Sequence, residues 1–97
     1  MTNADLEKLV ATSDEWIRER TGIRERRIAA EGQACSDLGL IAAERALKAA
    51  GISADELDMI LLATCTGDMP LPSTACLLQH LLVATRAAAC DVSAACC

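Results

Sequence analysis

Hydrophobic and polar positions along the chain follow patterns that predict both helices and strands. Residues 35–50 carry polar side chains on one narrow stripe and are otherwise apolar, which indicates a buried helix. Residues 59–63 form a continuous apolar run, as in a strand covered on both faces, and residues 87–92 form a second run of small residues. A helix over residues 74–83 lies between them. Strand, crossover helix and parallel strand predict an α/β fold.

Capping signals predict two short helices before these elements. Residues 3–10 are predicted to be helical, with a cap at Thr2 or Asn3. Ser13 is a favourable cap for a second helix, which has two acids in its first turn and ends at a glycine. Residues 23–29 are then assigned to a short charged strand. We find no internal repeat or flexible linker that would divide the chain.

The charge distribution argues against binding to nucleic acid or membrane. The formal net charge is −5, and the one basic segment, residues 18–27, is interleaved with Glu19 and Glu25. We interpret it as a mixed-charge surface or a small anion site, because nucleic-acid binding requires a basic patch. The longest uncharged stretch, residues 69–85, is too short to cross a bilayer, and two prolines interrupt it. The beginning of the chain lacks an apolar signal core, so we expect a cytoplasmic protein.

The six cysteines predict neither a disulfide framework nor a metal site. No secretory signal accompanies them, no CxxC pair occurs, and the lone His80 is not spaced with cysteines as a zinc site needs. Most of the thiols are expected to be small buried hydrophobes. His80 itself is interpreted as a surface or helix-packing residue.

Cys96 is the candidate nucleophile. Residues 91–96 run from an apolar strand into small side chains, as in a strand-to-helix turn that presents one side chain at a helix start. Such a position favours a thiolate, which can take an acyl group from a thioester. On this spacing alone, a buried structural cysteine is the commoner outcome.

Four blocks of sequence resemble the β-ketoacyl-ACP synthase III family in order and separation. They are NADLEKLV at 3–10, TSDEWIRERTGIRERR at 12–27, PSTACLL at 72–78 and DVSAAC at 91–96. The resemblance implies a thiolase-like layered α/β fold. Residues 1–97 would be part of its N-terminal domain, lacking the first strand and everything after the nucleophile. It also implies that the enzyme condenses acyl-CoA with malonyl-ACP in fatty-acid synthesis, through an acyl-cysteine intermediate. Acetyl-CoA is the expected acyl donor.

The resemblance assigns roles to five residues. Cys96 accepts the acyl group, Trp16 stacks on the CoA adenine, and Arg20 and Thr21 line the CoA entrance. Leu71 lies in a loop that reaches across a dimer interface toward the partner's acyl pocket. Without the resemblance, Trp16 would be interpreted as a core aromatic and Leu71 as an ordinary turn residue. Arg20 and Thr21 would be interpreted as a solvated helix end.

Departures from the family pattern bear on the activity of this chain. The family's catalytic His and Asn come from the second half of the enzyme, so we expect the chain alone to be inactive. Cys90 stands where an aromatic is usual, Val83 where glycine is usual, and Cys97 where a small residue is usual. Cys76 is expected to have no chemical role.

Two alternative functions remain open. The chain could be a non-catalytic truncated fragment that serves only in association, or part of a synthase III-like starter acyltransferase of polyketide metabolism. No cofactor and no metal is expected, because acyl-CoA and acyl carrier protein are substrates. The full-length parent is expected to be a homodimer.

Overall fold

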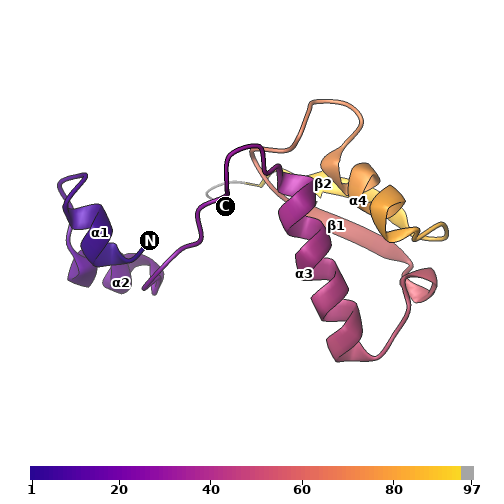
Figure 1. Cartoon of the computed structure of the whole chain (residues 1–97), viewed down its shortest axis with the longest axis horizontal. Helices are drawn as coiled ribbons and strands as arrows, with labels where there is room; N and C mark the ends of the chain where they lie inside the picture. The colour runs from indigo at the N-terminus through magenta and orange to yellow at the C-terminus, as the bar shows by residue number, and fades with distance from the viewer. Residues whose placement is uncertain (95–97) are drawn as a thin grey trace. The chain divides into compact units, whose positions relative to one another are not determined.

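The computed structural model describes residues 1–94, and residues 95–97 lie outside this description. The chain divides into two compact units, Met1–Ala30 and Glu31–Cys97, and each is described by itself (Figure 1). No helix in residues 1–94 combines the length and the hydropathy needed to cross a membrane.

Two short helices form the first unit, α1 (Asn3–Glu7) and α2 (Asp14–Thr21). Thr2 caps α1, because its side chain accepts from the Asp5 N–H while the Asp5 carboxylate accepts from the Thr2 N–H. This helix ends earlier than the predicted residue 10. Leu9 and Val10 are 66% and 56% exposed, so no burial supports a further turn.

The start and end of α2 are confirmed. The Ser13 side chain accepts from the Trp16 N–H at 3.1 Å, and Gly22 ends the helix in the left-handed region with φ 72°. Ile17 is the buried residue of this helix at 7% exposure, and it anchors α2 in the unit.

The predicted strand at residues 23–29 is wrong. Within the described residues this segment forms an isolated antiparallel bridge between Thr2 and Glu25. Main-chain hydrogen bonds flank the bridge, from the Asn3 N–H to the Arg24 carbonyl and between Met1 and Arg26. A strand requires a partner along its length. Here the paired residues 1–3 turn directly into α1, so the ladder cannot extend.

The second unit is a small α/β layer structure, which confirms the predicted fold class. Its elements in chain order are α3 (Cys35–Ala50), a 3₁₀ turn (Ala54–Glu56), β1 (Met59–Ala63), α4 (Thr74–Leu82) and β2 (Ala88–Val92). Within the described residues the sheet consists of β1 and β2, which pair in parallel with Leu61 opposite Cys90. Because parallel neighbours need a crossover, α4 returns the chain across one face of the sheet (Figure 1).

The core of this unit lies between the sheet and its helices. The buried residues are Ile60, Ala75, Leu78, Ala84 and Ala87. Side chains alternate along a strand, so Ile60 and Leu62 face the helices while Met59 and Leu61 face away. The latter two are 51% and 61% exposed. Within residues 31–94, the expectation that both faces of β1 are covered is therefore wrong.

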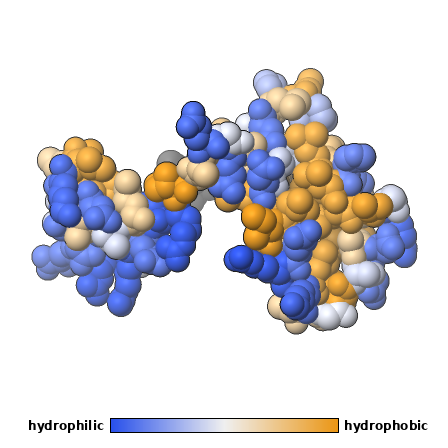
Figure 2. All heavy atoms as spheres, viewed as in Figure 1, coloured by the Kyte–Doolittle hydropathy of each residue, from blue (hydrophilic) through white to orange (hydrophobic). Residues whose placement is uncertain are grey.

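The bounds of α3 are confirmed, but its predicted burial is wrong. Leu38 and Ile41 are 45% and 43% exposed, whereas Leu40, Ala43 and Leu47 are half-buried. The helix packs against α4 along one face, and its opposite face is left exposed by the other elements of residues 31–94. Figure 2 shows the resulting hydrophobic surface over the second unit.

Candidate functional site

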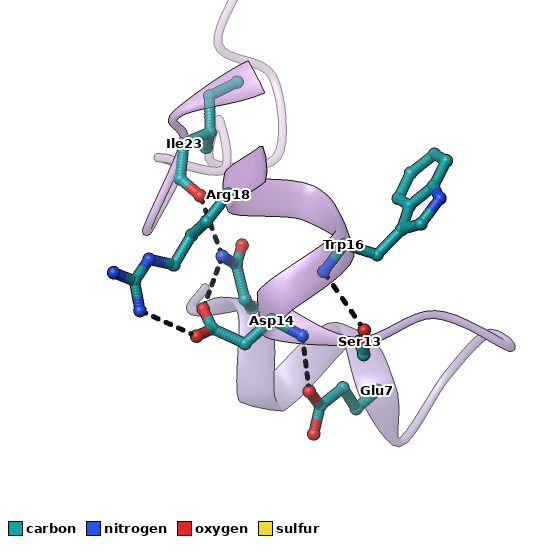
Figure 3. Close-up of polar contacts among 7 residues, drawn as sticks. Glu7, Ser13, Asp14, Trp16, Arg18 and Ile23 are labelled. Atoms are coloured by element: carbon teal, nitrogen blue, oxygen red, sulfur yellow. Dashed lines mark hydrogen bonds and ion pairs between the residues drawn. The ribbon is translucent and has the colours of Figure 1, made fainter. Parts of the chain in front are cut away.

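Trp16 and Arg20 lie four residues apart and share an exposed face of α2. Trp16 is 56% exposed, and the Arg20 guanidinium carbon lies 5.9 Å from the centre of its ring. At this distance a cation attracts the electron-rich ring face. Figure 3 shows the indole projecting from α2 away from Asp14 and Arg18. The first unit thus presents an aromatic platform with a positive charge beside it.

Asn3 holds this platform in place from the other side of the helix pair. Its amide is 1% exposed and donates to Asp14 Oδ1 and to the Ile23 carbonyl, both at 2.8 Å. Its Oδ1 atom accepts from Arg26 at 3.0 Å. A buried amide with its donors and acceptor satisfied is a rigid connection. The sequence suggested only a helix cap at Asn3 and did not reveal this role.

The Asp14 carboxylate connects this centre to the surface of α2. Its pKa is lowered, first by the hydrogen bond from the Asn3 amide and then by Arg18, whose Nη1 lies 3.3 Å from Asp14 Oδ2 (Figure 3). The main-chain N–H of Asp14 donates to the Glu7 carboxylate at 2.6 Å. These contacts join the start of α2 to the end of α1.

The other residue predicted to line the CoA entrance, Thr21, makes contacts within the helix end. Its hydroxyl donates to the Ile17 carbonyl at 2.7 Å and accepts from the Ile23 N–H at 3.1 Å. A hollow of about 620 Å³ lies elsewhere on this unit. It is lined by Asp14, Glu15, Arg18, Glu19, Gly22 and Arg24. Three carboxylates and two guanidinium groups make it a mixed-charge surface.

In the second unit, candidate chemistry gathers at the carboxyl end of the sheet. The Thr64 N–H donates to the Val92 carbonyl at 3.0 Å, which carries the strand pairing past β1. The Ser93 hydroxyl donates to the Cys65 sulfur at 3.8 Å. A hollow of about 260 Å³ is lined by Ala63, Thr64, Cys65, Val92 and Ala94. Ligands of parallel sheets bind at this edge.

The predicted nucleophile, Cys96, and its neighbour Cys97 lie outside the described residues. The described chain reaches the edge of the hollow at Ala94, two positions before Cys96 in the sequence. Cys65 is an exposed thiol at this edge that the sequence analysis did not single out. Cys65 follows β1 in the chain, and a thiol just after a predicted strand was the sequence feature that could have marked it as a candidate site residue.

Leu71 lies in the loop between β1 and α4 and is 85% exposed. Pro70 and Pro72 flank it, and the peptide bond between Leu71 and Pro72 is cis. A large apolar side chain this exposed is available for contact with another molecule.

Two aspartates that the sequence analysis did not assign hold this loop. Asp91 in β2 accepts from the Thr74 N–H at 2.8 Å through Oδ2 and from the Ala75 N–H at 2.7 Å through Oδ1. Asp68 accepts from the Ser36 N–H at 2.9 Å and from the Ser36 hydroxyl at 2.5 Å. Each carboxylate binds the first turn of a helix, where unpaired N–H groups need acceptors.

The remaining thiols correct one expectation. Cys35, Cys76 and Cys90 are half-buried rather than buried. The Cys76 sulfur accepts from the Ser73 hydroxyl at 3.1 Å, and His80 is exposed on α4. Within residues 1–94 no three His, Cys, Asp or Glu side chains are grouped as metal ligands.

Comparisons with known proteins confirm the resemblance inferred from the sequence blocks. No protein-family model matches the chain. It is 59% identical over 96 residues to "Beta-ketoacyl-[acyl-carrier-protein] synthase III" of Geobacillus kaustophilus, covering 99% of this chain and 31% of that protein. The protein of the same name from Symbiobacterium thermophilum is also 59% identical over 96 residues, which are 29% of its length.

Solved structures agree with the sequence comparisons. The 3-oxoacyl-[acyl-carrier-protein] synthase III of Aquifex aeolicus superposes with a TM-score of 0.77 at 53% identity, over 99% of this chain and 31% of that one. The priming β-ketosynthase of the R1128 polyketide biosynthetic pathway also has a TM-score of 0.77, at 35% identity, and 29% of it is covered. The chain spans about 30% of the length of the curated relatives it matches. The thiolase-like class expected from the resemblance is the fold of these synthases.

Proposed function

Because the chain corresponds to about 30% of a β-ketoacyl-[acyl-carrier-protein] synthase III, we propose that it is the part of such a synthase that carries the acyl-accepting thiol. The observation that carries the proposal is the identity of 59%, which extends over 96 of the 97 residues. The geometry supports it, since β2 leads to the edge of a hollow two residues before Cys96.

The proposed reaction begins with acyl transfer to Cys96. The thiolate attacks the thioester carbonyl of acyl-CoA, the carbonyl carbon gains a bond to the protein sulfur, and the CoA thiolate leaves. Malonyl-ACP then loses carbon dioxide, and the resulting carbanion attacks the acyl-cysteine. Its product, 3-oxoacyl-ACP, departs as the Cys96 sulfur is released. The whole enzyme is thus an acyltransferase that needs neither metal nor cofactor.

Trp16, Arg20 and Thr21 are proposed to bind the CoA moiety. The exposed indole offers a flat apolar face to the adenine, and base stacking on an aromatic ring contributes roughly 1–3 kcal/mol. The Arg20 guanidinium lies beside the ring and can pair with a phosphate through its planar fork. The Thr21 hydroxyl, held by two main-chain groups, would shape the helix end at this entrance.

The protein as a whole is proposed to act on acyl-CoA and acyl carrier protein in the cytoplasm, as a homodimer. The exposed Leu71 would then contribute to the acyl pocket of the partner subunit. The 97-residue chain alone is expected to be inactive, because the His and Asn that the family resemblance assigns to charge stabilisation lie outside it. Loss of one such donor costs roughly 10²–10³ in rate.

Two other functions have support. The R1128 priming ketosynthase matches as closely in fold as the fatty-acid enzyme, which favours a starter acyltransferase of polyketide metabolism as the second candidate. A non-catalytic role in association is supported by the exposed apolar side chains of Leu38, Ile41, Met59 and Leu61. The acyl-CoA donor that the enzyme prefers distinguishes the polyketide starter acyltransferase from the fatty-acid synthase. Absence of acyl transfer would favour the non-catalytic role in association.

A chimaera tests the proposal directly. The 96 matching residues of this chain would replace their counterpart in the Geobacillus kaustophilus synthase, and the purified protein would be incubated with acetyl-CoA. Mass spectrometry of the digested protein is expected to locate the acetyl group on Cys96. The label should disappear in Cys96→Ala and persist in the matched control Cys97→Ala. Acetylation of Cys97, or label that survives Cys96→Ala, would contradict the assignment.

A further inference from the structure

A continuous set of hydrogen bonds encloses the loop that carries Leu71. Thr74 is fully buried at 0% exposure, and its hydroxyl accepts from the Asp68 N–H at 2.8 Å. Asp68 in turn holds the start of α3 through Ser36, and Asp91 holds the start of α4. We call Asp68, Thr74 and Asp91 the loop clamp. It connects α3, α4 and β2 around residues 67–73.

Gly67 shows how tightly the clamp is packed. A Cβ atom at this position would lie 2.6 Å from the Thr74 hydroxyl oxygen and 3.6 Å from Asp91 Oδ2. The first distance is shorter than carbon and oxygen atoms tolerate without displacement. The chain therefore passes directly over the clamp where the loop begins, and this approach requires a residue without a side chain.

We propose that the loop clamp is a specificity-determining positioning element, which fixes the loop over residues 67–73 relative to the end of β2. Leu71 is 85% exposed, so its own side chain contributes little to holding it, and the ends of the loop set its position. On the proposed function, on which this inference rests, Leu71 limits the acyl pocket of the partner subunit. The clamp would then set how far Leu71 reaches from its own subunit into that pocket.

The two carboxylates differ in a way that provides matched variants. Both partners of Asp91 are main-chain N–H groups, which can only donate, so Asp91→Asn must lose one bond and face an N–H with its amide NH₂. One partner of Asp68 is the Ser36 hydroxyl, which can rotate and accept instead. Asp68→Asn therefore keeps two hydrogen bonds. The same change of carboxylate to amide should therefore release the loop in Asp91→Asn and leave it held in Asp68→Asn.

Amide hydrogen exchange of the 97-residue chain, followed by NMR, tests the clamp without any activity. Asp91→Asn is expected to speed exchange about tenfold at Thr74, at Ala75 and at the loop amides of residues 67–71, because a lost charged hydrogen bond costs that factor or more. The amides of the β1–β2 pairing should be unchanged. Faster exchange confined to Thr74 and Ala75, or an equal effect of Asp68→Asn, would overturn the clamp.

The specificity role is tested in the chimaera, as the ratio of kcat/KM for acetyl-CoA to kcat/KM for hexanoyl-CoA. Asp91→Asn is expected to change this ratio about tenfold, since displacement of a positioning group by 1 Å costs up to about 10²-fold. Asp68→Asn should keep the ratio. An equal fall for both donors would overturn the specificity role, because partial unfolding acts on both alike. Failure of the unsubstituted chimaera to acylate Cys96 would instead overturn the proposed function, and the specificity role with it.

Discussion

Gly39 and Gly67 are predicted to respond in opposite ways to the same substitution by alanine. A Cβ atom on Gly39, within α3, would lie 3.6 Å and 3.8 Å from methyl carbons of Leu78 and Leu62, which are ordinary contact distances. On Gly67 it would lie 2.6 Å from the Thr74 hydroxyl. The added methyl group is identical, so the difference in stability between the two variants reports the packing around each glycine.

The structure allows both magnitudes to be worked out. In a helix interior, replacing glycine by alanine is worth about 0.8–1.0 kcal/mol in propensity alone. The half-buried methyl of Gly39→Ala adds up to about 0.5 kcal/mol, part of the 0.8 kcal/mol of a fully buried methylene. Gly67→Ala is expected to cost about 1–3 kcal/mol, the usual effect of overpacking, because Thr74 is fully buried and its hydrogen bond to Asp68 resists displacement.

Urea unfolding followed by far-ultraviolet circular dichroism measures both effects in the 97-residue chain. Gly39→Ala should raise the free energy of unfolding by about 1 kcal/mol, or the melting temperature by about 4–8 °C, at an unchanged m-value. Gly67→Ala should lower both. A destabilising Gly39→Ala would refute the spacing between α3 and the layer beneath it, and a neutral Gly67→Ala would refute the tight packing of the loop clamp.

Three further substitutions test other parts of the chain. Because the pKa of Asp14 is lowered in the folded chain, its carboxylate stabilises the first unit at pH values above the ordinary carboxyl pKa of 3.8, and this stabilisation is lost as the pH falls through the lowered pKa. Asp14→Asn should therefore flatten the acid limb of unfolding followed by Trp16 fluorescence. An unchanged acid limb would show that Asp14 does not cause the loss of stability in acid. Val83 ends α4 with φ 56°, where a β-branched residue is strained by about 1–2 kcal/mol, so Val83→Asn should raise the melting temperature, and a fall would argue against strain. In the chimaera, Trp16→Ala should raise KM for acetyl-CoA about tenfold with little change in kcat, as expected from lost base stacking, whereas an unchanged KM would make Trp16 a packing residue only.

Local signals in the sequence were sufficient to predict most of the elements. Side-chain caps such as Ser13 and Ser73 act on N–H groups two or three residues away, so helix starts can be read directly from the chain. The apolar runs marked β1 and β2 within one residue, because a parallel strand buried in a layer needs them. Trp16 and Arg20 are neighbours because residues four apart lie side by side on a helix, whereas the exposure of Trp16 was implied only by the family resemblance.

Tertiary structure alone decided which faces are covered and how the loop is held. Periodicity predicted apolar surfaces on α3 and β1, but coverage depends on neighbouring layers, and within residues 31–94 these cover only one face. The partners of the clamp carboxylates are separated by 32 residues for Asp68 and by 16 and 17 for Asp91. No local pattern carries such pairings, because an aspartate in a strand or loop has the same sequence signature whether it faces water or the first turn of a distant helix.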